Sequence, residues 1–235
     1  MSIKTRLRMA VTAVLIGAYI LTPVRAKADI SANATFGNKY LLSVGGVIEK
    51  KPVFQPSVLL SKKGIYFNPW LNVNLPDMRV SEIDYTLGYG RSIEGLALDI
   101  SYNFFDLQNL GEGRANDNLH EIWLSISRPG IVSPRIKFAQ NLSGGTFPHS
   151  RGRYVELGLN YEMGIGRIPL TLDGCVHRRF GYFIKGSAWS IGQGSISMPF
   201  KAGKLSITPK MRVQRSLDSQ FEDNHDFGIS AGYNF

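Results

Sequence analysis

Several features that would place this chain in a common class are scarce or missing. Cys175 is the single cysteine among 235 residues, so the chain cannot form an internal disulfide. Charged residues account for 19% of the chain, which is too few for a coiled coil. After residue 28 no apolar run reaches the roughly 18 residues of a membrane-spanning helix, and helical periodicity is hard to find. These absences argue against a disulfide scaffold, a coiled coil and a protein with membrane-spanning helices.

Motifs for catalysis and cofactor binding are equally scarce. No G-x-S-x-G, H-E-x-x-H or phosphate-binding glycine motif is present. The four histidines and Cys175 are dispersed, without the spacing of a metal site. His149 precedes Ser150 in a predicted external loop, and a Ser–His contact there would serve a lipid-modifying enzyme. We predict no catalytic residue, metal or cofactor, and we retain a lipid-modifying enzyme as an alternative function.

The N-terminus is basic and then apolar. Basic residues at positions 4, 6 and 8 precede an apolar run over 9–21, and Ala26-Lys27-Ala28 supplies an A-x-A cleavage pattern. A run of about 13 residues is too short to span a membrane. The pattern therefore predicts a cleavable signal peptide over 1–28, which implies export. Its removal lowers the formal net charge from +9 to +4, so the basic composition does not indicate a nucleic-acid partner.

Residues 29–235 are dominated by alternation of apolar and polar side chains. Tyr85 and Leu87, for example, alternate with Asp84 and Thr86. This period of two is typical of β-strands. Twelve segments show it: 31–45, 52–61, 65–75, 80–91, 96–106, 118–128, 132–142, 153–163, 168–178, 187–200, 204–215 and 226–235. We predict one all-β domain, with a bulge near Gly192-Gln193-Gly194 in the tenth segment.

The connections between these segments differ in length in a regular way. Every even-numbered connection is short, whereas three odd-numbered ones, over 107–117, 143–152 and 216–225, are long and polar. Bacterial outer-membrane barrels combine short periplasmic turns with long external loops. A sheet in a bilayer must also close, because lipid cannot satisfy the backbone. The sequence therefore predicts a single transmembrane antiparallel up-and-down β-barrel of about twelve strands in the bacterial outer membrane.

The end of the chain and two internal segments carry further resemblances. Phe235 closes an alternating strand and resembles the terminal signal that outer-membrane proteins present to the barrel-assembly machinery. The segments 55–66 (QPSVLLSKKGIY) and 82–89 (EIDYTLGY) resemble the TorF-type porins of Gram-negative bacteria. The order of segments matches over most of residues 29–235. The resemblance implies a pore-forming outer-membrane protein and assigns no functional residue.

The polar alternates of the strands face inward if the apolar ones face lipid. The acidic candidates for the pore lining are Glu82, Asp84, Asp99, Glu121 and Glu156. The basic candidates are Arg135, Lys137, Lys210 and Arg212. So many carboxylates require a wet interior, because burial of unpaired charge in a dry core is too costly.

These charges allow two interpretations. Opposed acidic and basic walls would filter solutes by charge and size, or Arg135 and Lys137 would pair with Glu121 and Glu156 as a plug. We predict a non-enzymatic porin for passive diffusion of small polar solutes, in contact with outer-membrane lipid and lipopolysaccharide. A structural or adhesive barrel with a blocked lumen is a further alternative.

Overall fold

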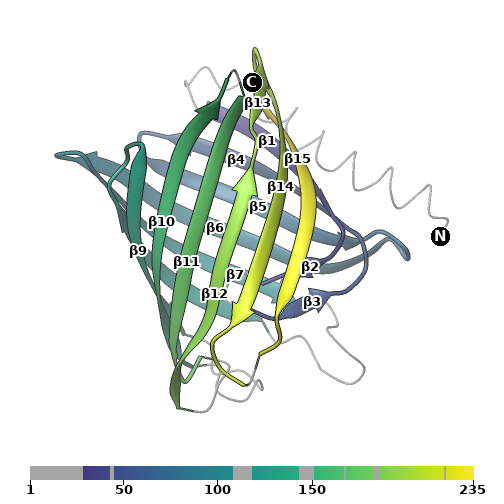
Figure 1. The fold of residues 1–235 in the computed structure, drawn as a ribbon, viewed down its shortest axis with the longest axis vertical. Coiled ribbons are helices and arrows are strands. Elements are labelled where there is room, and N and C mark those ends of the chain that lie inside the picture. The colour runs from purple at the N-terminus through teal and green to yellow at the C-terminus, as the bar shows by residue number, and fades with distance from the viewer. Residues whose placement is uncertain are drawn as a thin grey trace.

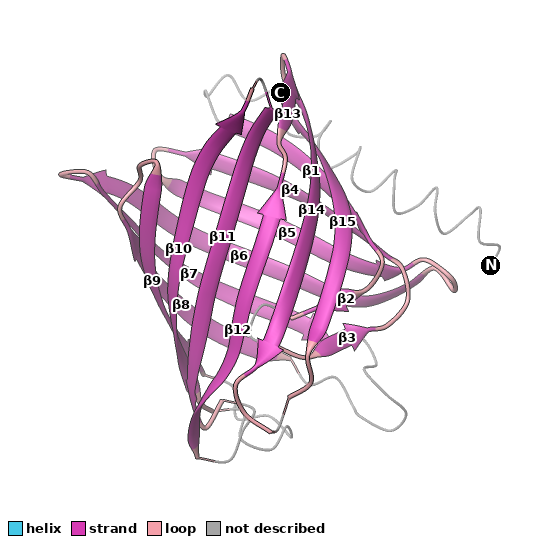
Figure 2. Ribbon diagram, in the orientation of Figure 1, coloured by secondary structure: helices cyan, strands magenta, loops and turns pink. Residues whose placement is uncertain are grey.

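The protein forms a closed β-barrel (Figure 1) in a computed structural model that describes residues 29–42, 45–107, 118–142, 151–166, 168–182, 186–219 and 221–235. The predicted signal peptide over 1–28 lies outside these ranges, as do His149 and Ser150. The described part consists of strands and loops (Figure 2). Within it, no helix is long and apolar enough to cross a membrane.

Twelve strand positions make up the wall, as the sequence predicts. Their bounds are β1 (Asp29–Gly37), β4 (Val53–Lys62), β5 (Ile65–Asn74), β6 (Arg79–Ile93), β7 (Leu96–Leu107), β8 (Leu119–Ser127), β9 (Val132–Asn141), β10 (Arg153–Ile165), β11 (Ile168–Phe180), β12 (Ser187–Ser197) followed by β13 (Phe200–Ala202), β14 (Leu205–Ser216) and β15 (Asn224–Asn234). Every neighbouring pair is antiparallel, and β1 pairs with β15 to close the sheet. The fold predicted from alternation and loop length is confirmed.

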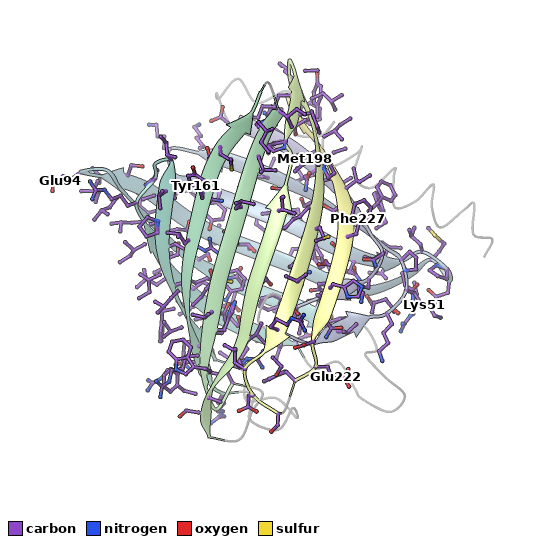
Figure 3. All side chains as sticks on the ribbon, viewed as in Figure 1. Lys51, Glu94, Tyr161, Met198, Glu222 and Phe227 are labelled. Atoms are coloured by element: carbon purple, nitrogen blue, oxygen red, sulfur yellow. The ribbon has the colours of Figure 1, made fainter. Side chains whose placement is uncertain are left out.

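One end of the barrel is built from tight hairpin turns. Lys63 and Gly64 join β4 to β5 with φ of 51° and 86°, and Glu94 and Gly95 join β6 to β7 with φ of 51° and 80°. Two consecutive positive φ values are typical of type I′ hairpins, whose twist matches the strands they join. Figure 3 labels Glu94 at the tip of such a turn and Lys51 on the opposite side of the molecule.

The barrel is apolar outside and polar inside. On β7, Ile100 and Tyr102 are 49% and 42% exposed on the outer surface, whereas Ser101 and Asn103 are 4% and 2% exposed. Leu124 on β8 and Ile136 on β9 continue the exposed apolar band. A soluble protein would not expose so continuous an apolar surface. Lipid contact accounts for it, because the outward residues of such a barrel then need no second layer.

One predicted strand end is wrong, and one predicted bulge is displaced by two residues. The first predicted segment, 31–45, leaves the wall after Gly37, because the chain beyond it turns into the barrel and is buried there. The predicted bulge near Gly192 lies instead at Ser190, where the register between β11 and β12 shifts. Gly192 and Gly194 keep regular pairing with Val176 and Gly174. The phase change in the sequence therefore arises from the extra residue before Ile191.

Candidate pore lumen and constriction

The connection between β1 and β4 folds into the barrel and forms a small hairpin. Its strands are β2 (Tyr40–Leu41) and β3 (Val47–Glu49), which pair with each other and not with the wall. Leu41 is 2% exposed although it belongs to a connection between two strands of the wall. We call the described residues of this connection, 38–42 and 45–52, the inner hairpin. Its residues 39–42 line the interior of the barrel.

Side chains of the wall hold the inner hairpin by its backbone carbonyls. Arg212 on β14 donates a hydrogen bond from Nη2 to the carbonyl of Leu41 at 3.1 Å. Gln214 on the same strand donates to the carbonyl of Leu42 at 2.7 Å. Arg212 is itself oriented by Asp226, which accepts from its Nε and Nη2 at 2.9 and 2.7 Å. Such a bidentate pair fixes the guanidinium plane, so the hairpin is attached to an oriented donor.

The inner hairpin also contacts a second part of the wall, on β5. The ring of Tyr40 lies 5.6 Å from that of Trp70 on β5. Asn74, at the end of β5, donates a hydrogen bond to Glu49 Oε2 at 2.8 Å. The hairpin therefore contacts both β14 and β5, which are four strand positions apart in the wall.

Two of the predicted basic residues, Lys210 and Arg212, lie across the barrel from four of the predicted acidic residues. Five strands separate β14 from β7 by way of β12, β11, β10, β9 and β8, and five by way of β15, β1, β4, β5 and β6. Lys210 and Arg212 on β14 are thus diametrically opposite β7. The acidic candidates sit on β7 and its two neighbours: Glu82 and Asp84 on β6, Asp99 on β7 and Glu121 on β8.

Several of these charges border one cavity of about 400 Å³ inside the barrel. Asp84 and Glu121 line it from one side, and Lys210 and Arg212 line it from the other. Lys39 of the inner hairpin also reaches it. Glu82 and Asp99 are not among its lining residues. The inner hairpin and the cavity between the two charged walls together form the candidate constriction.

The charges at the cavity differ in how far they are already paired. Arg212 is committed to Asp226, and Glu121 accepts hydrogen bonds from Trp123 Nε1 at 2.6 Å and from the Tyr182 hydroxyl. Lys210 makes no hydrogen bond or ion pair with the residues that the structure describes. A permeating solute would therefore meet Lys210 as an uncommitted cation.

Arg135 joins three strands of the wall. From β9 its Nε donates to Glu156 Oε1 on β10 at 2.7 Å, and its two terminal nitrogens donate to Asp173 on β11. Gly158 lies between Arg135 and Cys175 in the strand register. A Cβ at Gly158 would stand 2.5 Å from Arg135 Cζ. The missing side chain therefore allows the guanidinium to cross β10 and reach β11.

The remaining predicted residues have separate surroundings. The Lys137 ammonium lies 3.2 Å from the centroid of the Trp123 ring, and no salt bridge joins it to Glu121 in the described part of the chain. Asp99 accepts a hydrogen bond from the Tyr66 hydroxyl at 3.1 Å. Phe235 donates its backbone N–H to the carbonyl of Ile30 at 3.0 Å, so the chain end is tied to the first strand.

The lumen contains an apolar cluster near the inner hairpin. Tyr154 on β10 and Tyr182, between β11 and β12, are 1% and 4% exposed, with ring centroids 5.0 Å apart. Ala139, Leu42 and Trp123 pack against them. The pKa of Tyr182 lies well above its ordinary value, chiefly because burial disfavours the phenolate. Tyr154, Tyr182, Trp123 and Leu42 of this cluster line the same cavity as Lys210 and Arg212.

Sequence reasoning missed residues that extend the inward face of β11. Cys175, His177 and Arg179 continue the alternation that begins at Asp173, and extending that alternation would have placed them in the lumen. Arg179 is 1% exposed, and its guanidinium carbon lies 4.2 Å from the Phe221 ring centroid. The sequence contains no comparable signal for the inward course of the hairpin.

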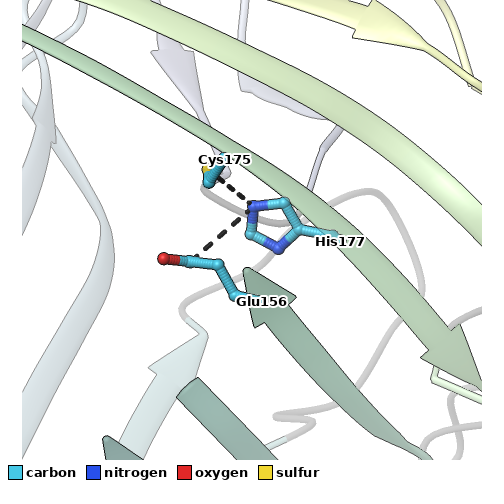
Figure 4. A group of neighbouring side chains, drawn as sticks. All are labelled: Glu156, Cys175 and His177. Carbon is cyan, nitrogen blue, oxygen red and sulfur yellow. Dashed lines mark hydrogen bonds and ion pairs between the residues drawn. The ribbon is translucent and has the colours of Figure 1, made fainter. Parts of the chain in front are cut away.

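Cys175 and His177 come together with Glu156 of β10 at one point (Figure 4). His177 Nε2 lies 3.2 Å from Cys175 Sγ and 3.7 Å from Glu156 Oε2. His177 pairs directly with Glu156 across β10 and β11, which explains their proximity. The group combines a thiol, an imidazole and a carboxylate.

No protein-family model and no curated protein matches the amino-acid sequence. Solved structures do match the fold. The KdgM porin superposes with a TM-score of 0.52 at 8% sequence identity, covering 88% of this chain and 99% of that chain. The NanC porin superposes with a TM-score of 0.54 at 7% identity, covering 87% of this chain and 98% of that chain. The chain therefore has the fold of these porin barrels.

Proposed function

We propose that the protein is a porin of the bacterial outer membrane through which small hydrophilic solutes diffuse passively. One observation carries the proposal: an apolar outer surface encloses a lumen in which opposed ionisable groups border a cavity of about 400 Å³. Charged groups on the inside of a barrel require water, and water in a barrel of this width is a path for polar solutes. The fold shared with the KdgM and NanC porins supports the same conclusion.

Finer aspects of the proposal follow from the sequence. The basic and apolar N-terminus supports export by a signal peptide over 1–28. The strand that ends at Phe235 supports recognition by the barrel-assembly machinery. The apolar belt supports contact with lipid and lipopolysaccharide. We also place the protein in the TorF-type group of porins on the resemblance of its strand and turn segments.

A barrel with a blocked lumen is the second candidate. The buried pair Tyr154 and Tyr182 favours it, because these rings and the inner hairpin fill part of the bore. Such a barrel would act through its external loops. The lipid-modifying enzyme depends on His149 and Ser150, which lie outside the described residues, and it stays an untested prediction.

Single-channel recording distinguishes the two barrel functions. The mature protein is refolded in detergent, its folding is checked by heat-modifiable gel mobility, and it is inserted into a planar bilayer. We expect discrete conductance steps. Folded protein without steps would contradict the porin and support the blocked barrel.

Charge reversal then tests the role of the constriction. Lys210→Glu replaces an uncommitted cation at the cavity by an anion, so the reversal potential in a salt gradient should shift toward cation selectivity. Lys204→Glu makes the same charge change in an exposed turn at the hairpin end of β14 and is the matched control. Equal shifts in the two variants would remove Lys210 from the filter.

A further inference from the structure

We propose that Glu156, Cys175 and His177 bind a divalent metal ion of the zinc class on the lumen wall. Carboxylate, thiolate and imidazole are the three side-chain types that bind zinc in proteins. Glu156 stands on β10 directly opposite His177 on β11, and Cys175 precedes His177 by two residues. All three side chains therefore point to the same face of the sheet, toward the lumen.

The separations of the ligand atoms suit one small cation. Cys175 Sγ and His177 Nε2 are 3.2 Å apart, His177 Nε2 and Glu156 Oε2 are 3.7 Å apart, and all three atoms lie within 4.8 Å of one another. Zinc bonds of about 2.0–2.3 Å in tetrahedral geometry hold ligand atoms roughly 3.3–3.8 Å apart. Small adjustments of these side chains would therefore be enough to bind the ion.

The hydrogen bonding of His177 favours a bound cation over a cluster in which the three side chains only bond to one another. Cys175 and Glu156 both converge on Nε2, although one N–H can serve only one of them well. A cation at the shared position would satisfy the thiolate, the imidazole nitrogen and the carboxylate oxygen together.

Arg135 orients the carboxylate as an outer partner does in metal sites. It donates to Glu156 Oε1 at 2.7 Å, which leaves Oε2 facing His177. Ligating carboxylates are commonly held in this way by a second hydrogen bond. Glu156, Cys175 and His177 are 8%, 7% and 0% exposed, so the surroundings limit their motion.

Binding is a ligand exchange with a simple proton balance. The metal takes the thiolate of Cys175, and the thiol proton passes to bulk water. Three protein ligands leave a fourth position for a water molecule or a solute from the lumen. No oxidant or reductant takes part.

Cobalt(II) is the probe for the test, because it occupies zinc sites and a cobalt–thiolate bond gives a near-ultraviolet charge-transfer band. The refolded full barrel, in detergent and with its thiol reduced, is titrated with Co²⁺ and then with Zn²⁺. We expect a thiolate band that saturates at one equivalent and disappears on addition of Zn²⁺. Cys175→Ser should abolish the band, and His177→Gln or Glu156→Gln should weaken binding at least about tenfold. His225→Gln, on the exposed face of β15, is the control and should bind like the wild type.

Folding of each variant is checked by heat-modifiable gel mobility. A folded wild type without the band would overturn the proposal, whatever the variants do. So would a band of equal affinity in folded His177→Gln and Glu156→Gln, because the cysteine alone would then account for it. The test contains no conductance measurement, so its result is independent of the proposed porin function.

Discussion

The crossing of Arg135 over Gly158 makes a sharp prediction for stability. In Gly158→Ala the new Cβ would lie 2.5 Å from Arg135 Cζ and 2.6 Å from Nε. Real Cβ atoms essentially never approach other atoms so closely, so the Arg135 guanidinium, at the end of its side chain, must shift. We expect this shift to break its hydrogen bonds to Glu156 and Asp173 together.

The cost follows from how exposed these charges are. The side chains of Arg135, Glu156 and Asp173 are 26%, 11% and 22% exposed, between a buried and a surface ion pair. Breaking a buried pair costs about 3–5 kcal/mol, and a surface pair contributes about 0–1 kcal/mol. We therefore expect Gly158→Ala to lower the free energy of unfolding by about 2 kcal/mol, which is roughly a thirtyfold change in the equilibrium constant.

A double-mutant cycle with Arg135→Ala tests the mechanism. Unfolding in urea is followed by tryptophan fluorescence for the wild type, both single variants and the double variant. Without the guanidinium there is nothing to displace, so Gly158→Ala should be neutral or slightly stabilising in the Arg135→Ala background. Gly174→Ala, whose Cβ would meet no atom closer than 3.7 Å, is the control. Equal destabilisation by Gly158→Ala in both backgrounds would refute the steric argument.

Three further predictions concern the hairpin, the chain end and an exposed loop. Arg212→Ala removes the donor to the Leu41 carbonyl, so single-channel conductance should rise and fluctuate more; unchanged current traces would contradict this. Deletion of Phe235 should slow assembly in cells while refolding in detergent persists, as measured by the rate of appearance of the heat-modifiable form. The pKa of Asp223 lies below its ordinary value, because the Ser216 N–H and then Arg215 stabilise the carboxylate. The stabilisation of the loop by the Asp223 carboxylate is complete above about pH 4 and is lost as the pH falls through the lowered pKa. In Arg215→Ala, carboxyl NMR titration should show a higher pKa for Asp223, and an unchanged value would contradict this explanation.

Much of the fold follows from two patterns in the sequence. Alternation of apolar and polar residues places Asp84 and Lys210 inside and Leu87 and Met211 outside, because lipid and water select opposite faces of one strand. The difference between short and long connections indicates the orientation of every strand. Closure follows because a sheet edge has no partner in lipid.

The inner hairpin could not be predicted in this way. Residues 40–42 are apolar or aromatic, and such residues leave water equally well by facing lipid or by packing inside the barrel. Alternation therefore continues past Gly37 in the sequence, although the wall ends there. The choice between the two depends on Arg212 and Gln214, which are more than 160 positions away in the chain.

Contacts between strands that are not neighbours could not be predicted from the sequence patterns either. Pairing rules relate Arg135 to its neighbours on β8 and β10, not to Asp173 on β11. The feature of the sequence that permits the contact between Arg135 and Asp173 is Gly158, a glycine at an inward position of β10. The grouping of Cys175 and His177 was missed for a related reason: their third partner, Glu156, comes from another strand and has no fixed spacing to them in the chain.

The separation of charge across the bore has a consequence for the orientation of whatever passes. With carboxylates on β6 and β8 and uncommitted lysine on β14, the cavity has an electric dipole perpendicular to the barrel axis. Such a field exerts a torque on a solute that carries both signs of charge, and it acts even when the net force is zero. Isomers of equal size and net charge but different dipole moments should therefore cross at different rates.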